Sequence, residues 1–172
     1  GGAGLTNADV MNSYVLDKLQ LMAKKGNSKY KMKPIRMKNG KERYLLLISN
    51  ENAIQLRQDA RFEKHMLSIV EAGHADDPFA SGALGVWGNI ILQECDYISQ
   101  FASGDDSYSR NLLLGANAMV LGWAQTSDYT EERRDHNRLL SMACDEIRGQ
   151  KKLQFDGVDM GVAQIVASNK IG

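Results

Sequence analysis

This sequence of 172 residues contains few cysteines, has no net charge and lacks long apolar runs. Two cysteines, Cys95 and Cys144, are too few for a disulfide scaffold, so we expect each to be a small buried apolar residue. The 21 basic residues balance the 21 acidic ones, whereas a nucleic-acid-binding protein usually carries a basic excess. No apolar run approaches the length that crosses a bilayer, so we expect no membrane partner.

The chain begins with Gly1-Gly2-Ala3-Gly4 and has no methionine at its start. We expect residues 1–5 to be an engineered scar or a processed end, and the chain to be an excised or processed piece of a longer protein. Residues 6–172 are long enough to bury a core. We expect them to form one domain, which can consist of two closely joined lobes.

Capping and turn signals predict the first elements of the chain. Thr6-Asn7-Ala8-Asp9 fits a capping box, apolar residues then recur at helical spacing, and Gly26 is a natural terminator. These signals predict a helix over residues 7–25. Asn39-Gly40 favours a type I′ turn and predicts a hairpin over residues 31–49, whose second strand is apolar on both faces and should be covered on both.

The remaining elements follow from apolar periodicity and from glycine and proline breakers. A helical region is expected from Ser49 or Asn50 to the breaker at residues 72–78. A strand follows over 86–94, with a bend at Gly85 and Gly88, and then a polar loop over 103–107. The closing strand is expected over 155–166, with a turn at Gly157. Residues 112–114 should form a short strand that leads into an alanine-rich helix ending at Trp123. A further helix is expected over residues 131–148. The irregular interleaving of strands and helices favours an α+β fold.

Charge is unevenly distributed although it balances in total. Ten basic residues lie between Lys18 and Arg43, opposed only by Glu42. An acidic neighbourhood follows later and contains Glu94, Asp96, Asp105 and Asp106. Two interpretations are open: a solvated hairpin face, or a basic patch that meets an acidic patch on the next copy of the chain. Under the second interpretation the subunit-contact patch is Lys31, Lys33, Lys38 and Lys41.

Residues that could carry catalysis are few. His65 is expected to be a partly buried helix residue, and His136 to be a structural histidine on an apolar helical stripe. His74 with Asp76 and Asp77 is the one local group that resembles a metal or acid–base cluster, but aspartates before a proline are also common in turns. Trp87 and Trp123 are surrounded by apolar residues and are expected to be core anchors. We expect neither a catalytic centre nor a cofactor or metal.

The order of motifs resembles one protein family. The motifs are Tyr44-Leu45-Leu46-Leu47-Ile48-Ser49-Asn50, Leu56-Arg57-Gln58-Asp59, the run from Pro78 through Phe79-Ala80-Ser81-Gly82 and Trp87 to Leu92-Gln93-Glu94, Asn111-Leu112-Leu113-Leu114-Gly115-Ala116, Phe155-Asp156-Gly157 and Gly161-Val162-Ala163. This order is similar to that of the major capsid proteins of tailed phages, and most similar to the N-four-type coat protein family. The resemblance extends over most of residues 6–172.

The resemblance implies the Hong Kong 97-type capsid fold, with axial and peripheral lobes, in which this chain would lack the family's N-terminal arm and extended loop. It implies a structural virion protein that is not an enzyme and that self-assembles, as pentamers and hexamers, into an icosahedral shell around phage DNA. Expected partners are other copies of the chain, scaffolding or decoration proteins, and packaged DNA held only non-specifically. Assembly is expected in the cytoplasm of the bacterial host.

Two other functions stay open at this point. A nucleic-acid-binding module would use the basic segment from Lys18 to Arg43, and its affinity would fall steeply with rising salt. A small-molecule enzyme would use His74, Asp76 and Asp77, and would be revealed by a bound divalent ion.

Overall fold

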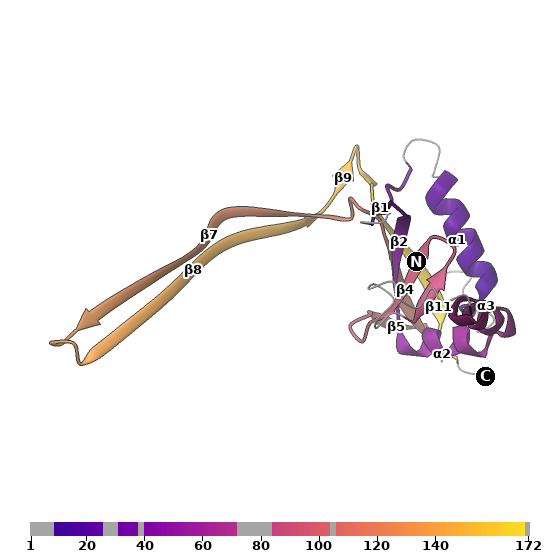
Figure 1. Ribbon diagram of the computed structural model, residues 1–172, viewed down its shortest axis with the longest axis horizontal. Helices are drawn as coiled ribbons and strands as arrows, with labels where there is room; N and C mark the ends of the chain where they lie inside the picture. The colour runs from indigo at the N-terminus through magenta and orange to yellow at the C-terminus, as the bar shows by residue number, and fades with distance from the viewer. Residues whose placement is uncertain (1–8, 26–30, 38–39, 72–83, 104–105, 171–172) are drawn as a thin grey trace.

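The structure is a computed structural model that describes residues 9–25, 31–37, 40–71, 84–103 and 106–170. Figure 1 shows a body, in which helices lie beside a mixed β-sheet, and a long two-stranded hairpin that projects far away from it. The helices in the described residues are α1 (Ser13–Lys25), α2 (Asn50–Gln58) and α3 (Ala60–Glu71).

The body is organised around β2 (Glu42–Ile48), a central strand of the sheet. It pairs in parallel with β4 (Ile90–Glu94) on one side and antiparallel with β6 (Asp106–Leu114) on the other. The edges are β3 (Gly85–Trp87) and β11 (Val162–Ser168), and two short strands, β1 (Ile35–Arg36) and β5 (Gln100–Ser103), attach to β2 and β6. β2 is therefore an internal strand and not an edge, as the sequence predicted, although only one of its faces is fully buried.

Alternation along β2 places the core on one face of the sheet. Tyr44, Leu46 and Ile48 are buried, while the residues between them are half-buried. They pack with the buried residues of α1, among them Leu16 and Leu19. Burying a side chain of this size contributes about 1.5–3 kcal/mol, which makes this face the main source of the body's stability.

Most turn predictions are confirmed, with changes at element ends. The hairpin over residues 31–49 exists as β1 and β2, and Gly40 has a φ of 76° in its turn. The strand predicted over residues 86–94 is two strands, because Gly88 (φ 56°) forms a tight turn between β3 and β4. The first helix begins at Ser13, since the Asn12 side chain accepts the amide of Val15 and so supplies the cap.

The chain from residue 115 to 152 differs most from expectation. The predicted helix ending at Trp123 and the predicted helix over residues 131–148 are both wrong: these residues form the strands β7 (Met119–Arg134) and β8 (Leu139–Lys152) of the projecting hairpin. Beyond them, Gly157 lies in the predicted turn, here between β9 (Gln154–Phe155) and β10 (Val158–Asp159). The closing strand β11 begins only at Val162.

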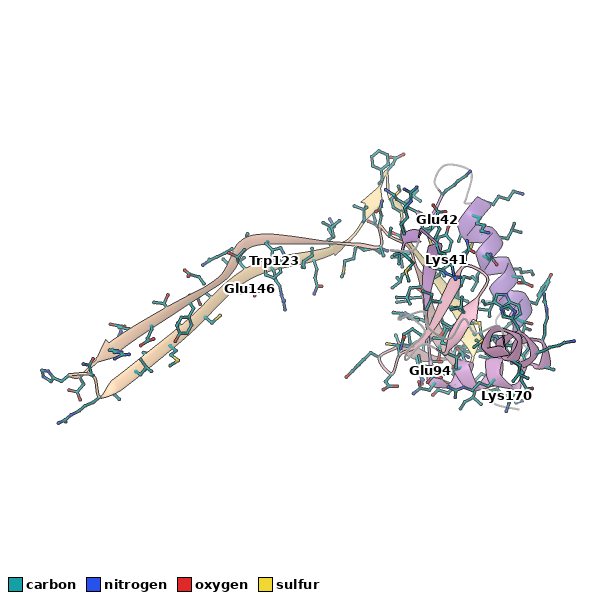
Figure 2. All side chains as sticks on the ribbon, in the orientation of Figure 1. Lys41, Glu42, Glu94, Trp123, Glu146 and Lys170 are labelled. Carbon is teal, nitrogen blue, oxygen red and sulfur yellow. The ribbon has the colours of Figure 1, made fainter. Side chains whose placement is uncertain are left out.

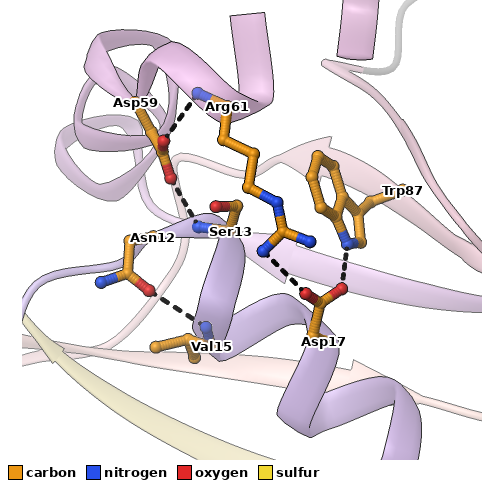
Figure 3. A network of polar contacts seen from close by, with 7 residues as sticks. All are labelled: Asn12, Ser13, Val15, Asp17, Asp59, Arg61 and Trp87. Carbon is orange, nitrogen blue, oxygen red and sulfur yellow. Dashed lines mark hydrogen bonds and ion pairs between the residues drawn. The ribbon is translucent and has the colours of Figure 1, made fainter. Parts of the chain in front are cut away.

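A single carboxylate, that of Asp59, joins three helix ends. It lies between α2 and α3 and accepts the amides of Ser13, 2.8 Å away, and Arg61, 3.0 Å away (Figure 3). Burial raises the pKa of Asp59, but these backbone hydrogen bonds outweigh burial and lower the pKa of the carboxyl below its usual value. The negative charge also faces the positive ends of α1 and α3.

Replacing Asp59 with asparagine should destabilise the body by about 1–2 kcal/mol at neutral pH, because the variant lacks the charge at two helix N-termini. Since the folded-state pKa is lowered, the stabilisation is present above the unfolded pKa, about 3.9, and is lost as the pH falls through the folded-state value. Urea unfolding of wild type and Asp59→Asn between pH 3 and 7 should therefore give curves that converge in acid. Asp96→Asn, an exposed change of the same kind, is the control, and parallel curves would contradict the prediction.

Candidate subunit interface

The projecting hairpin is exposed along its length; we call it the arm and define it as residues Met119–Lys152. Its strands contain 16 and 14 residues, and every residue in them is exposed (Figure 2). β7 and β8 pair only with each other among the described strands. The exposed large apolar side chains of the arm are Met119, Val120, Leu121, Trp123, Tyr129, Leu139, Leu140, Met142 and Ile147. An exposed apolar set of this extent marks a surface that another molecule covers.

The two faces of the outer half of the arm differ in charge. One face combines apolar side chains with the ion pair of Glu131 and Arg133. The other, which we call the acidic face, has more carboxylates than cations. Directly paired residues share a face in an antiparallel sheet, and neighbours along a strand alternate between faces. Tyr129 pairs with Cys144, and two residues further along β8 Met142 and then Leu140 lie on the same face. The other face carries the pair of Asp128 and Asp145. Figure 2 shows side chains of the arm leaving both sides of the ribbon.

The inner half of the arm presents a second apolar strip. Met119, Leu121 and Trp123 alternate along β7 and therefore lie on one face. The register shifts between Trp123 and Gln125 and again before Asp128, and bulges of this kind bend a strand. Figure 2 places Trp123 and Glu146 close to the bend in the arm.

The arm's tip is a turn of residues 135–138. Asp135, His136 and Asn137 have φ values of 51°, 53° and 69°, and the amide of Arg138 donates to the Asp135 carbonyl at 3.0 Å. Asp, His and Asn are the non-glycine residues that adopt positive φ most readily. His136 is therefore a turn residue, and its expected place on a helical stripe is wrong.

The arm's root is held to the body by close backbone contacts. The amide of Gly115 donates to the Gly161 carbonyl at 2.8 Å, and the amide of Ala116 donates to the Lys33 carbonyl at the same distance. A Cβ on Gly161 would lie 2.6 Å from the Asn117 carbonyl carbon and 2.7 Å from the Ala118 amide nitrogen. Only glycine allows the two chain segments to approach this closely.

The change Gly161→Ala should displace the root of the arm and destabilise the chain by about 1–3 kcal/mol, since backbone atoms must move to admit the methyl group. Gly149→Ala is a matched control, because a Cβ there meets nothing within 4 Å. Thermal unfolding of the two variants measures the difference. Equal melting temperatures would show that the root tolerates the added carbon.

The predicted basic patch lies partly at this root. Lys31 and Lys33 are exposed on the extended segment that contacts Gly115 and Ala116. Lys41 is also exposed and immediately precedes β2, and Lys38 lies outside the described residues. The structure thus groups Lys31 and Lys33 beside the arm, an association that the sequence did not indicate.

The predicted acidic neighbourhood is partly engaged within the chain. Glu94 forms an ion pair with Arg57, and Asp96 accepts a hydrogen bond from Asn50 at 2.8 Å. Asp106 faces the buried Tyr108, whose pKa is raised by burial and by that carboxylate. Asp105 lies outside the described residues. The better exposed acidic pair, Asp128 and Asp145, was missed because Asp145 was expected to lie in a helix, where it would not pair with Asp128 across two strands.

The structure describes only some of the residues considered for chemistry. His65 lies edge-on to Trp87, with ring centroids 4.6 Å apart, and His74, Asp76 and Asp77 fall outside the described residues. In the part of the chain that is described, three or more potential metal ligands are nowhere grouped. None of the helices in those residues has the length and apolarity to span a membrane.

The tryptophan and the cysteine of the body are less exposed than those of the arm. Trp87 is a core anchor at 6% exposure and donates to Asp17 at 2.8 Å, as Figure 3 shows. Trp123, at 49% exposure, is not the core anchor that was expected. Cys95 is half-buried, whereas Cys144 is exposed on the arm, so the expectation of a buried residue is wrong there.

Comparison with known proteins identifies the family. A family model described as phage capsid protein matches residues 1–169. The chain belongs to the phage capsid protein family. No curated protein matches it.

Solved capsids share its fold. The capsid of Ralstonia phage GP4 is 26% identical with a TM-score of 0.74, and the match covers 99% of this chain and 50% of that one. The cyanophage Pam1 capsid is 18% identical with a TM-score of 0.73, covering 96% and 48%. The capsid of Helicobacter pylori bacteriophage KHP30 is 19% identical with a TM-score of 0.64, covering 94% and 60%. This capsid chain therefore spans about half the length of the first two.

The fold is the α+β Hong Kong 97-type fold of phage capsids, as the resemblance implied. The family consists of structural virion proteins, not enzymes. Neither the family nor the similar capsids support the alternative of a nucleic-acid-binding module.

Proposed function

We propose that this chain is the shell-forming part of a phage major capsid subunit, which assembles with copies of itself into an icosahedral shell around phage DNA. The observation that carries the proposal is the arm: a hairpin of long strands with apolar side chains in solvent and, among the described strands, no third strand beside it. An isolated two-stranded hairpin is marginally stable in water. A neighbouring subunit would supply the missing contacts.

The arm's dimensions suit this role. A strand rises about 3.3 Å per residue, so β7 extends roughly 50 Å. A compact body of the remaining chain length has a diameter of about 37 Å. The arm can therefore lie across a whole neighbouring body, and free strand edges and apolar faces are surfaces on which that neighbour can pair and pack.

Most finer features of the proposal come from the family, whereas the lysine contacts come from the charge distribution in the sequence. Copies would form pentamers and hexamers, with Lys31, Lys33, Lys38 and Lys41 contributing to subunit contacts. Scaffolding or decoration proteins would be additional partners, and the packaged DNA would be held without sequence preference. Assembly would take place in the cytoplasm of the bacterial host.

The test is negative-stain electron microscopy of the full reading frame that encodes this sequence, expressed alone and together with its neighbouring phage genes. Closed, uniform shells that contain this chain are the expected result. Soluble particles under both conditions, with a steeply salt-dependent affinity for DNA, would overturn the proposal in favour of nucleic-acid binding.

A further inference from the structure

The acidic face of the arm carries an unfavourable charge pair. Asp128 lies directly opposite Asp145, and like charges at such positions destabilise a sheet. Neither aspartate has a cationic partner among the described residues. Glu132, nearer the tip on the same face, differs because Arg134 pairs with it at 2.5 Å. A positive charge from another molecule would therefore relieve the repulsion between these two aspartates.

The arm's root carries the complementary charge. Lys31 and Lys33 are exposed, two residues apart on an extended segment, and so project to the same side. Met32 between them packs against Gly115, which fixes the segment beside the base of the arm. Within the described residues neither lysine forms an ion pair. We call these two lysines the basic root.

Spacing excludes an ion pair between the two groups within one chain. Nine residues separate Met119, where the arm begins, from Asp128, which places the acidic pair roughly 30 Å from the root. Equivalent points on two bodies packed side by side are separated by about one body diameter, or about 37 Å. An arm that extends toward its neighbour therefore brings its acidic pair close to the neighbour's root.

We propose that Asp128 and Asp145 of one copy dock on Lys31 and Lys33 of a second copy of this chain. The inference rests on the proposed function and deepens it, since it names which surface of one subunit meets which surface of the next. The contact is heterologous, because the two participating surfaces differ, and repeating it around an axis closes a ring of copies. Complementary charge then fixes the register in which the arm lies on its neighbour.

Charge reversal and its compensation test this contact. Sedimentation velocity on the full chain at low salt measures the concentration at which oligomers form. Asp145→Lys and Lys33→Glu should each raise that concentration about tenfold, and the double variant should return to within about threefold of wild type. Adding salt should weaken wild-type association, since exposed ion pairs are screened.

Two controls keep the outcomes distinct. Glu132→Lys makes the same charge change on the same face, and we expect an effect several times smaller than that of Asp145→Lys. Melting temperatures within a few degrees of wild type would show that the variants still fold. In one outcome the wild type forms oligomers that each single reversal weakens, while the double variant does not recover. That result would overturn the docking but leave the proposed function standing. A wild-type chain that stays monomeric at all concentrations tested would overturn the docking, whereas the proposed function is decided by the microscopy of shells.

Discussion

Deleting residues 120–151 and joining the flanking residues through two glycines is expected to abolish assembly while leaving the body folded. The arm pairs only with itself among the described strands, so its removal takes no side chain out of the core. It does remove the exposed apolar surface that we assign to subunit contacts. Electron microscopy of the deletion variant should show no shells, and its far-ultraviolet circular dichroism and cooperative thermal unfolding should be retained.

A smaller change within the arm is the control for this deletion. Replacing residues 135–138 by Asn-Gly shortens the tip but keeps both strands, because that dipeptide supports a two-residue hairpin turn. We expect this variant to assemble. Shells from the full deletion would show that the arm is dispensable, and an unfolded deletion variant would show that the arm supports its own body.

Replacing Asn111 with alanine should remove about 4 kcal/mol of stability, a large share of the 5–15 kcal/mol typical of a domain. The fully buried Asn111 side chain accepts the Ser49 amide at 3.0 Å and donates to Asn52 at 2.8 Å. Asn52 in turn donates to the Ser168 carbonyl on β11 at 2.8 Å. The change leaves a buried donor and a buried acceptor unsatisfied, each costing about 1–3 kcal/mol.

Urea unfolding of the full chain measures this loss, with Asn50→Ala as the matched control. Asn50 is exposed and bonds only to Asp96 in the described residues, so its replacement should cost less than about 1 kcal/mol. A loss below 1 kcal/mol for Asn111→Ala would mean that water replaces the missing amide. In that case the network would contribute to specificity more than to stability.

The body was largely predictable from sequence because its signals are local and consistent. The apolar run of β2 and the turns at Gly40 and Gly157 each have one physical solution. The cap of α2 was narrowed to Ser49 or Asn50, and the structure uses Ser49. Element ends were less predictable. The predicted capping box begins at Thr6, whereas Asn12 supplies the observed cap, and Gly88 can either bend one strand or separate two. Packing against the rest of the body decides both choices.

The arm was not predictable by the same reasoning because its apolar residues satisfy two periods. Leu140, Ala143 and Ile147 fit a helical stripe, whereas Leu140, Met142 and Cys144 alternate as in a strand. A signal was present in Asp135-His136-Asn137, three residues suited to positive φ and unsuited to a helix interior. A hairpin without a core of its own cannot be recognised from burial patterns, since nothing in it is buried.

The candidate interface was predictable in its basic half only. Lysines between two elements can be located from sequence, but the position of Lys31 and Lys33 beside the arm is set by the contact of Met32 and the Lys33 carbonyl with Gly115. The acidic half of the interface depends on the pairing of Asp128 with Asp145, and no local sequence motif predicts that pairing.

Gly122 lies directly opposite Gly149, so the inner half of the arm has one cross-strand pair without side chains. A Cβ at either position would meet nothing closer than 3.9 Å, so the site is open and neither glycine is required by packing. The register shifts that follow at Trp123 and Gln125 weaken the same region further. This region is therefore suited to act as a hinge, or joint. The root and the outer half of the arm can each stay rigid while the angle between them varies. In the proposed shell, where copies would meet around both five-fold and six-fold axes, this joint would let the arm adapt without changing either contact surface.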